Sequence, residues 1–460
     1  MKRLFLLLLI SVASIESNAQ TPVGTWSGNL NVSGIKLPLI FHIQQSGDSL
    51  VSTLDSPAQG AKGIPVNKTT FLNNELKIEI QSIGADYRGT LQGDSISGVF
   101  TQMGMNLPLI LKTNLEKVKP PQRPQTPAPP FSYNIEDVTF TNPIDTNTLA
   151  GTLTTPRNKS QIPVVIMITG SGAQDRDETL FEHKPFWVIA HHLTNNGVGV
   201  LRLDDRGVGG SSKGKKGATS ANFATDIDAA VNYLSKRGFT YIGLIGHSEG
   251  GMIAPMVAGK NKKVGFIISM AGPGVNINEL MVKQTFDAVK SYGVTDENAR
   301  EKANYNQKIY NFITNYKGDS LAKEFRTFIQ SELPEPDEFK EMTAEMKQST
   351  IDQQISAATS PWFVYFLKFK PQAYISKLKI PVLALNGNKD VQVYAKDNLA
   401  GWEKSLKKAG NKNYEVVELA GLNHLFQEAK TGSVTEYAEI EQTISPKALD
   451  VITTWILKLK

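Results

Sequence analysis

Apolar residues follow two different spacings along this sequence of 460 residues, and the change falls near residue 130. Up to about residue 115, short alternating or continuous apolar runs are separated by Gly, Asn, Asp and Ser pairs, a pattern typical of β-strands joined by turns. Further along, continuous apolar runs alternate with longer stretches in which apolar residues recur at helical spacing. The chain is also longer than one hydrophobic core usually supports, so two domains are predicted.

The first region, residues 20–117, is predicted to be a small all-β domain. Two of its segments are similar, KLPLI at residues 36–40 and NLPLI at residues 106–110. A β-sandwich and a lipocalin-like barrel both fit the pattern, and strand spacing alone does not choose between them. Strands are expected at Ile35 to Ile43, Leu76 to Ile80, Ser97 to Phe100 and Leu107 to Leu111.

The second region, residues 134–460, is predicted to be an α/β domain with a mostly parallel sheet. Continuous apolar strands indicate a sheet that helices cover on both faces, and such sheets are parallel. Two earlier runs, at residues 138–141 and 149–154, predict an antiparallel hairpin at the sheet edge. The buried strands are expected at residues 163–169, 198–203, 241–246, 264–270, 381–385 and 414–419, and helices at 181–196, 223–237 and 446–459.

Residues from about 275 to 375 interrupt this alternation. They are rich in Lys, Glu, Asn and Tyr and contain no buried strand pattern. We interpret them as a helical cap inserted between two strands, where it would overhang the carboxyl ends at which open α/β sheets bind ligands. Late in this segment stand Trp362, Phe363, Tyr365, Phe366 and Phe369. This aromatic cluster could line a substrate pocket, with Trp362 and Phe363 as contacts, or form the core of the cap.

A proline-rich segment separates the two regions. Residues 119–130 read KPPQRPQTPAPP. Proline fixes its own backbone angle and favours extended geometry in the residue before it. Residues 118–133 are therefore predicted to be a semi-rigid linker between domains, with a peptide ligand for another protein as the alternative.

Residues 1–19 have the layout of a secretory signal peptide. Lys2 and Arg3 provide a positive start, Leu4 to Ile10 is a short apolar run, and Ala19 is a small residue at the expected cleavage point. The apolar run is far shorter than the roughly 18 residues that a spanning helix needs. We expect export to a bacterial periplasm or to the medium, with no membrane span after the peptide is removed; a retained membrane anchor is the alternative.

Charge and cysteine content exclude several functions. The formal net charge is only +5 and the lysines are spread out, so no nucleic-acid partner is expected. The absence of cysteine excludes disulfides, thiol nucleophiles, zinc–thiolate sites and a lipid-modified cysteine. No G-x-G-x-x-G fingerprint and no H-E-x-x-H pair occurs, so neither a dinucleotide cofactor nor the metal of a zinc protease is expected.

The pattern G-x-S-x-G occurs twice, and its context separates the two copies. The first, at residues 210–214, lies in a Gly/Ser/Lys-rich loop with no helix directly after it and is interpreted as coincidence. The second, at residues 246–250, follows the strand YIGLI and precedes a small apolar helix start. Strand, sharp turn and helix are the context of a nucleophile elbow, so Ser248 is the candidate nucleophile.

A serine nucleophile needs a base, and histidine is suited because its pKa lies near neutrality. Of the six histidines, His424 is the last and follows the late strand at residues 414–419. His247 is adjacent to the serine, with its side chain expected to point elsewhere. The orienting acid should follow the strand between them, which selects Asp390 over Asp397 and Glu418.

The oxyanion hole needs two backbone N–H donors. One should be the amide of Glu249, the residue after the nucleophile. The other should come from the glycine loop behind the strand at residues 163–169, where Ser171 is the first choice and Gly172 the second. The charged run at residues 175–178 that follows could shape the acyl pocket or pair internally.

Taken together, these pieces resemble bacterial α/β-hydrolase esterases that carry a cap insertion, over about residues 135–460. The resemblance implies carboxylester hydrolysis of short- to medium-chain acyl esters, without a cofactor, acting on a small-molecule or glycan-linked ester. It departs from many lipases and esterases in having Thr-Gly instead of His-Gly at the oxyanion loop. The matching segments are GSGAQDRDE at 170–178, DDRGVG at 204–209, GHSEGG at 246–251, SPWF at 360–363, NGNKD at 386–390 and GLNH at 421–424.

Other functions remain compatible with these residues. The same triad would serve a serine peptidase or a carbohydrate deacetylase. A protein of a different class, in which the β domain binds a glycan or lipid and the second domain is inert, is less consistent with the intact Ser, Asp and His.

Overall fold

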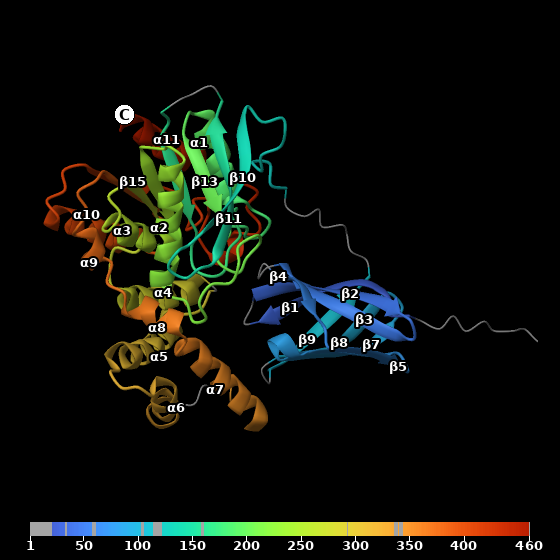
Figure 1. Ribbon diagram of the computed structural model, residues 1–460. Helices are drawn as coiled ribbons and strands as arrows, with labels where there is room; N and C mark the ends of the chain where they lie inside the picture. The colour runs from blue at the N-terminus through green and yellow to red at the C-terminus, as the bar shows by residue number, and fades with distance from the viewer. Residues whose placement is uncertain are drawn as a thin grey trace, which may run out of the picture. The chain divides into compact units, whose positions relative to one another are not determined.

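The computed structural model describes residues 21–32, 35–57, 61–102, 105–113, 122–157, 161–291, 293–334, 339 and 344–459 (Figure 1). The expected signal peptide at residues 1–19 and the start of the expected linker, residues 118–121, lie outside this set. Backbone contacts divide the chain into two compact units, Met1–Val118 and Lys119–Lys460.

The N-terminal unit is a closed antiparallel β-barrel. Its eight-strand ring runs β2-β1-β9-β8-β7-β6-β5-β3, and pairing of β3 with β2 closes it, while β4 pairs with β3 outside the ring. A sandwich would leave free strand edges, whereas each strand of this closed ring is paired on both sides. Of the two architectures that the sequence allowed, the N-terminal unit therefore forms the barrel. The strands are β1 (Gly24–Val32), β2 (Ile35–Ser46), β3 (Ser49–Ser56), β4 (Ala61–Pro65), β5 (Lys68–Leu72), β6 (Glu75–Ile80), β7 (Ala85–Gln92), β8 (Ser95–Gln102) and β9 (Met105–Lys112).

Large side chains fill the barrel interior. Every second residue of β6 is buried, which is the alternation expected when one face of a strand points inward. Trp26, Phe41, Tyr87 and Phe100 are each at most 2% exposed and pack into one cluster. The Tyr87 hydroxyl lies among them and donates to the carbonyl oxygen of Ile96 at 2.9 Å, so its polar end is satisfied inside the core.

The C-terminal unit contains a mixed eight-stranded sheet in the order β10-β11-β13-β12-β14-β15-β16-β17. From β13 to β17 the strands are parallel, whereas β10 and β11 form an antiparallel hairpin at one edge. The predicted sheet and its edge hairpin are therefore confirmed. The strands are β10 (Tyr133–Thr141), β11 (Thr148–Pro156), β12 (Val164–Ile168), β13 (Gly199–Leu203), β14 (Ile242–His247), β15 (Val264–Met270), β16 (Val382–Gly387) and β17 (Tyr414–Leu419).

Helices cover both faces of this sheet, so its strands are apolar throughout. On β12, Val164, Ile166 and Ile168 pack into one core, and Val165 and Met167 into the other. The first core lies under α2 (Ser220–Lys236), α3 (Glu249–Ala258) and α10 (Ala395–Lys408). The second lies under α1 (Pro185–Asn195) and α11 (Pro446–Lys458). Two-sided burial is the physical reason why the strands show no alternation in sequence.

A helical cap is inserted between β15 and β16, as predicted. Its helices α5, α6 and α7 have a core of their own, in which Tyr310, Ile313 and Phe325 are buried. Figure 1 shows α4 and α8 next to the sheet domain and α5, α6 and α7 beyond them. The cap consists of α4 (Ile277–Ser291), α5 (Asp296–Asn315), α6 (Leu321–Glu332), α7 (Ala344–Ala358), α8 (Pro361–Lys368) and α9 (Gln372–Ile375). Among the helices described, we find none with the length and apolarity needed to cross a bilayer.

The described part of the proline-rich segment is hydrogen-bonded to the C-terminal unit. The guanidinium of Arg123 donates to the carbonyl oxygens of Phe181, Ala438 and Ile440. The side chain of Gln125 donates to the Ile444 carbonyl at 2.8 Å. Residues 122–130 are thus held by specific contacts on this unit.

Candidate active site

Ser248 stands at a sharp turn between β14 and α3. Its backbone angles are φ 52° and ψ −116°, a conformation that costs a non-glycine residue free energy and that typically marks functional sites. The flanking glycines are required by close backbone contacts. A Cβ on Gly246 would lie 2.1 Å from the Gly250 carbonyl oxygen, and a Cβ on Gly250 would lie 2.2 Å from that of Ile168. The turn therefore has the form of a nucleophile elbow.

His424 and Asp390 form a buried pair on the loops after β17 and β16. Nδ1 of His424 donates to Oδ2 of Asp390 at 2.8 Å, and the two residues are 3% and 2% exposed. The other carboxylate oxygen accepts the backbone N–H groups of Gln392 and Val393, each at 2.8 Å. With Nδ1 donating to a carboxylate, Nε2 of the neutral imidazole is left as a proton acceptor.

Ser248 and His424 line the same pocket, a cavity of about 290 Å³. Among the hydrogen bonds of the described residues, none joins the serine hydroxyl to the imidazole. Catalytic hydrogen bonds are often long in ligand-free enzymes and shorten when substrate binds. The structure thus brings all three predicted residues to one end of the sheet, with the His424–Asp390 contact formed.

Both residues predicted to supply the oxyanion-hole amides, Glu249 and Ser171, line this pocket. Glu249 begins α3, and the first N–H groups of a helix have no partner within it. Ser171, on the loop after β12, also lines the pocket. Gly172, the second choice for the other donor, lines a neighbouring pocket instead, which makes Ser171 the better placed of the two.

Comparison with known proteins shows the family of this fold. The sequence profile of the alpha/beta hydrolase fold matches residues 163–430, more than half of the chain. The protein belongs to the α/β-hydrolase fold family. Esterase EstD of Thermotoga maritima is similar, with 27% identity over 331 residues, which cover 72% of this chain and 69% of that protein.

Solved structures similar to this α/β-hydrolase include an esterase of Pyrococcus furiosus, with 16% identity and a TM-score of 0.43, covering 71% of this chain and 92% of that one. Est1E from Butyrivibrio proteoclasticus has 17% identity and a TM-score of 0.39, covering 70% and 98%. Proline iminopeptidase of Mycobacterium smegmatis has 15% identity and a TM-score of 0.43, also covering 70% and 98%.

The side chain of Glu249, the first residue of α3, connects this helix of the hydrolase to the cap. Its carboxyl accepts the Ser220 hydroxyl at 2.6 Å and the indole N–H of Trp362, on α8, at 3.1 Å. Burial raises the pKa of Glu249, and hydrogen bonds from Ser220, Trp362 and Ser171 only partly oppose this. A cap residue is thereby hydrogen-bonded to the residue that follows Ser248.

The aromatic cluster of the cap lies both at the pocket that contains Ser248 and in a packed core. Trp362, Phe363 and Phe366 line the Ser248 pocket. Phe369 and Tyr365 pack with Trp362 and Phe366 in a cluster against α3. One side of the cluster therefore faces the pocket and the other forms a core between cap and sheet domain.

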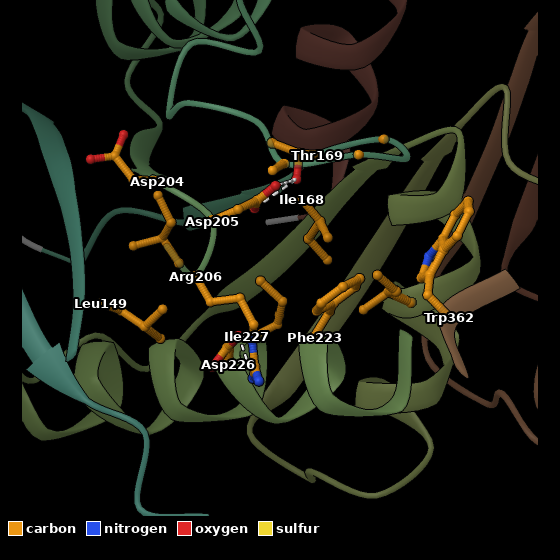
Figure 2. A pocket seen from close by; sticks show the side chains of 15 residues that line it. Leu149, Ile168, Thr169, Asp204, Asp205, Arg206, Phe223, Asp226, Ile227 and Trp362 are labelled. Carbon is orange, nitrogen blue, oxygen red and sulfur yellow. Dashed lines mark hydrogen bonds and ion pairs between the residues drawn. The ribbon is translucent and has the colours of Figure 1, made fainter. Parts of the chain in front are cut away.

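A second pocket, of about 180 Å³, is lined in part by Thr169, Gly170 and Gly172 of the same glycine loop (Figure 2). It shares Gly170 and Trp362 with the first pocket. Its walls are largely apolar, with contributions from Ile168, Phe223 and Ile253 among others.

Asp205 borders this second pocket and holds both ends of the glycine loop. Its carboxylate accepts the Thr169 hydroxyl at 2.9 Å and the Gln174 amide at 2.9 Å; Figure 2 shows the contact with Thr169. Burial raises the pKa of Asp205 to about 7, a shift that these hydrogen bonds oppose and that the charges of Glu178 and Asp226 increase.

The charged run after the glycine loop pairs with residues elsewhere in the chain, an outcome that the sequence did not reveal. Arg176 binds Asp204 at 2.7 Å, and Asp177 binds Arg202. Glu178 binds His247, whose ring lies within the site and not away from it.

Another histidine of the pocket and the two rival acids have different partners or positions. His183 lines the pocket, but its ring bonds Thr443 and the Tyr437 carbonyl, and burial lowers its pKa to about 4. Asp397 borders a different pocket, and Glu418 is exposed on β17. Within the described residues, no group of three or more His, Asp or Glu side chains is arranged to hold a metal ion.

Proposed function

We propose that this hydrolase is an exported serine carboxylesterase, with Ser248 as nucleophile, His424 as general base and Asp390 as the residue that orients the base. The observation that carries the proposal is the buried 2.8 Å contact between His424 and Asp390 at the rim of the pocket that contains Ser248. The strained elbow at Ser248 supports it further, because such strain is retained where it serves chemistry.

In the acylation step, the Ser248 hydroxyl oxygen attacks the ester carbonyl carbon while its proton passes to Nε2 of His424. The carbonyl π electrons move to the oxygen, which becomes an oxyanion held by the amides of Glu249 and Ser171. The oxyanion then collapses, the bond to the alcohol oxygen breaks, and that oxygen takes the proton from His424. The products are an acyl-serine and a free alcohol.

In the deacylation step, water attacks the acyl-serine while its proton passes to His424. The second oxyanion collapses, the Ser248 oxygen leaves and recovers the proton, and the carboxylic acid is released. Asp390 keeps the imidazole in the required tautomer and stabilises the imidazolium in both steps.

The pocket supports a short- to medium-chain acyl ester as substrate. Its volume of about 290 Å³ is small, and Trp362, Phe363 and Leu425 contribute apolar surface. The similarity to an enzyme named Esterase EstD supports the same reaction class.

Replacement of Ser248 by Ala tests the assignment. The variant should lose hydrolysis of p-nitrophenyl acetate and butyrate by about 10³-fold or more, with an unchanged circular-dichroism spectrum. The wild type should be labelled by a fluorophosphonate probe and the variant should not. Undiminished turnover in the variant, or an unlabelled wild type, would refute the proposal.

Reaction class and export need separate measurements. From a panel of acyl esters, aminoacyl amides and acetylated glycans, the enzyme should hydrolyse the acyl esters fastest. Faster hydrolysis of the amides would indicate a peptidase, and faster hydrolysis of the acetylated glycans would indicate a deacetylase.

Export is tested by cell fractionation of a bacterial host, which should recover the protein, shortened by residues 1–19, from the periplasm or medium.

A further inference from the structure

We infer that Glu178 and His247 form a buried ion pair that positions the glycine loop and His424 around Ser248 and places a fixed positive charge beside the nucleophile. The inference deepens the proposed function and rests on it. His247 precedes Ser248 in sequence, and Glu178 comes from the loop after β12. Both residues are 6% exposed.

The contacts of His247 define which atoms carry protons. Nε2 lies 3.0 Å from the carbonyl oxygen of His424. A carbonyl oxygen only accepts, so Nε2 must carry a hydrogen. Nδ1 lies 3.0 Å from Oε1 of Glu178, and the same oxygen accepts the Gly170 amide at 2.7 Å. An ionised carboxylate accepts both contacts when Nδ1 also carries a hydrogen, which makes the ring an imidazolium.

The charges around the ring favour this state. Burial lowers the pKa of His247, but the Glu178 carboxylate, the His424 carbonyl and the charge of Asp390 together raise it above its ordinary value. The titratable groups that face His247 are Glu178, His424 and Asp390, from the loops after β12, β17 and β16. The ring of Phe426, 6.3 Å away, adds an apolar wall.

The same pair joins three catalytic elements. Through Oε1, Glu178 fixes the Gly170 amide, and a Cβ on Gly170 would lie 3.4 Å from that of Ser248, so the loop that carries Ser171 is held against the elbow. Through Nε2, His247 fixes the backbone of His424. Glu178 itself has a positive φ of 52°, a strained conformation that tertiary contacts must hold.

Glu178 and His247 are therefore positioning residues that act through Ser171 and His424. The imidazolium also favours the negative charge that develops on the substrate oxygen during both steps. Because this electrostatic role requires a protonated ring, breaking the pair should change the pH dependence of kcat. A role in packing alone would not produce this change.

The kinetic test compares Glu178→Gln with the wild type on p-nitrophenyl butyrate between pH 6 and 10. We expect kcat to fall by about tenfold or more, with KM changing by less than about threefold. Removal of the carboxylate lowers the pKa of His247, so the loss of activity at alkaline pH should begin at a lower pH in the variant. An unchanged kcat would overturn the inference. So would a lower kcat if activity is lost at the same alkaline pH in the variant as in the wild type.

A matched control is His42→Gln in the barrel, which also removes a histidine–carboxylate contact, to Asp55 at 2.9 Å. It should leave kcat and the pH profile unchanged.

A second measurement does not depend on whether the variant folds or on catalysis. In the wild type with ¹⁵N-labelled histidine, NMR between pH 6 and 9 should detect one ring whose two nitrogens stay protonated above the ordinary histidine pKa of about 6.5. Its absence would overturn the inference even if Ser248→Ala behaves as expected. If the doubly protonated ring is detected but Ser248→Ala remains active, the proposed function is contradicted and the ion pair is not.

Discussion

The indole N–H of Trp362 donates to the carboxyl of Glu249 at 3.1 Å, so the cap is hydrogen-bonded to the residue that follows Ser248. Trp362 also lines both pockets. Its position makes Trp362 a wall between the Ser248 pocket and the second, largely apolar cavity.

Replacement of Trp362 by Ala should join the two cavities and favour longer esters. We expect kcat/KM for p-nitrophenyl octanoate relative to butyrate to rise by about tenfold, because additional methylene groups then find apolar surface. Trp362→Phe is the matched control, since it removes the N–H but keeps an aromatic ring as part of the wall, and its ratio should change by less than about twofold. Equal loss for both esters in Trp362→Ala would contradict this role.

Asp205 should make stability fall as pH rises. Burial raises its pKa to about 7, whereas an unfolded Asp titrates near 4. Between these values the folded protein binds more protons than the unfolded chain, so its stability decreases with rising pH. Asp205→Asn should remove this pH-dependent part of the free energy of unfolding, which amounts to up to about 4 kcal/mol between the two pKa values.

Calorimetry from pH 4.5 to 8 measures the effect. The stability of Asp205→Asn relative to the wild type should increase as the pH rises from about 4 to about 7 and then level off. A difference that stays constant across this range would rule out Asp205 as the titrating group.

Gly250 should tolerate no side chain, because a Cβ there would lie 2.2 Å from the carbonyl oxygen of Ile168. We expect Gly250→Ala to destabilise the protein by about 1–3 kcal/mol or more, since backbone atoms must move apart. Gly259→Ala, at the end of the same helix, is the control: its φ is −65° and its Cβ would meet no atom closer than 3.2 Å. Urea unfolding should separate the two variants, and equal midpoints would contradict the steric argument.

The sequence by itself determined the class of the fold and the three candidate catalytic residues. Apolar runs without alternation required a sheet covered on both faces, and parallel strands place their carboxyl ends at one edge. Ser248, Asp390 and His424 each follow such a strand, so local pattern and chain order were enough to nominate them.

Tertiary structure alone decided which residues connect these loops and how the barrel closes. The contact of Glu178 with His247 joins positions 69 residues apart, and nothing in either local segment specifies the other. Closure of the N-terminal sheet likewise depends on the pairing of β1 with β9, in which Ser27 lies opposite Lys112. Hydrogen-bond partners and pocket walls arise from packing between distant segments, whereas strands and turns follow from their own residues.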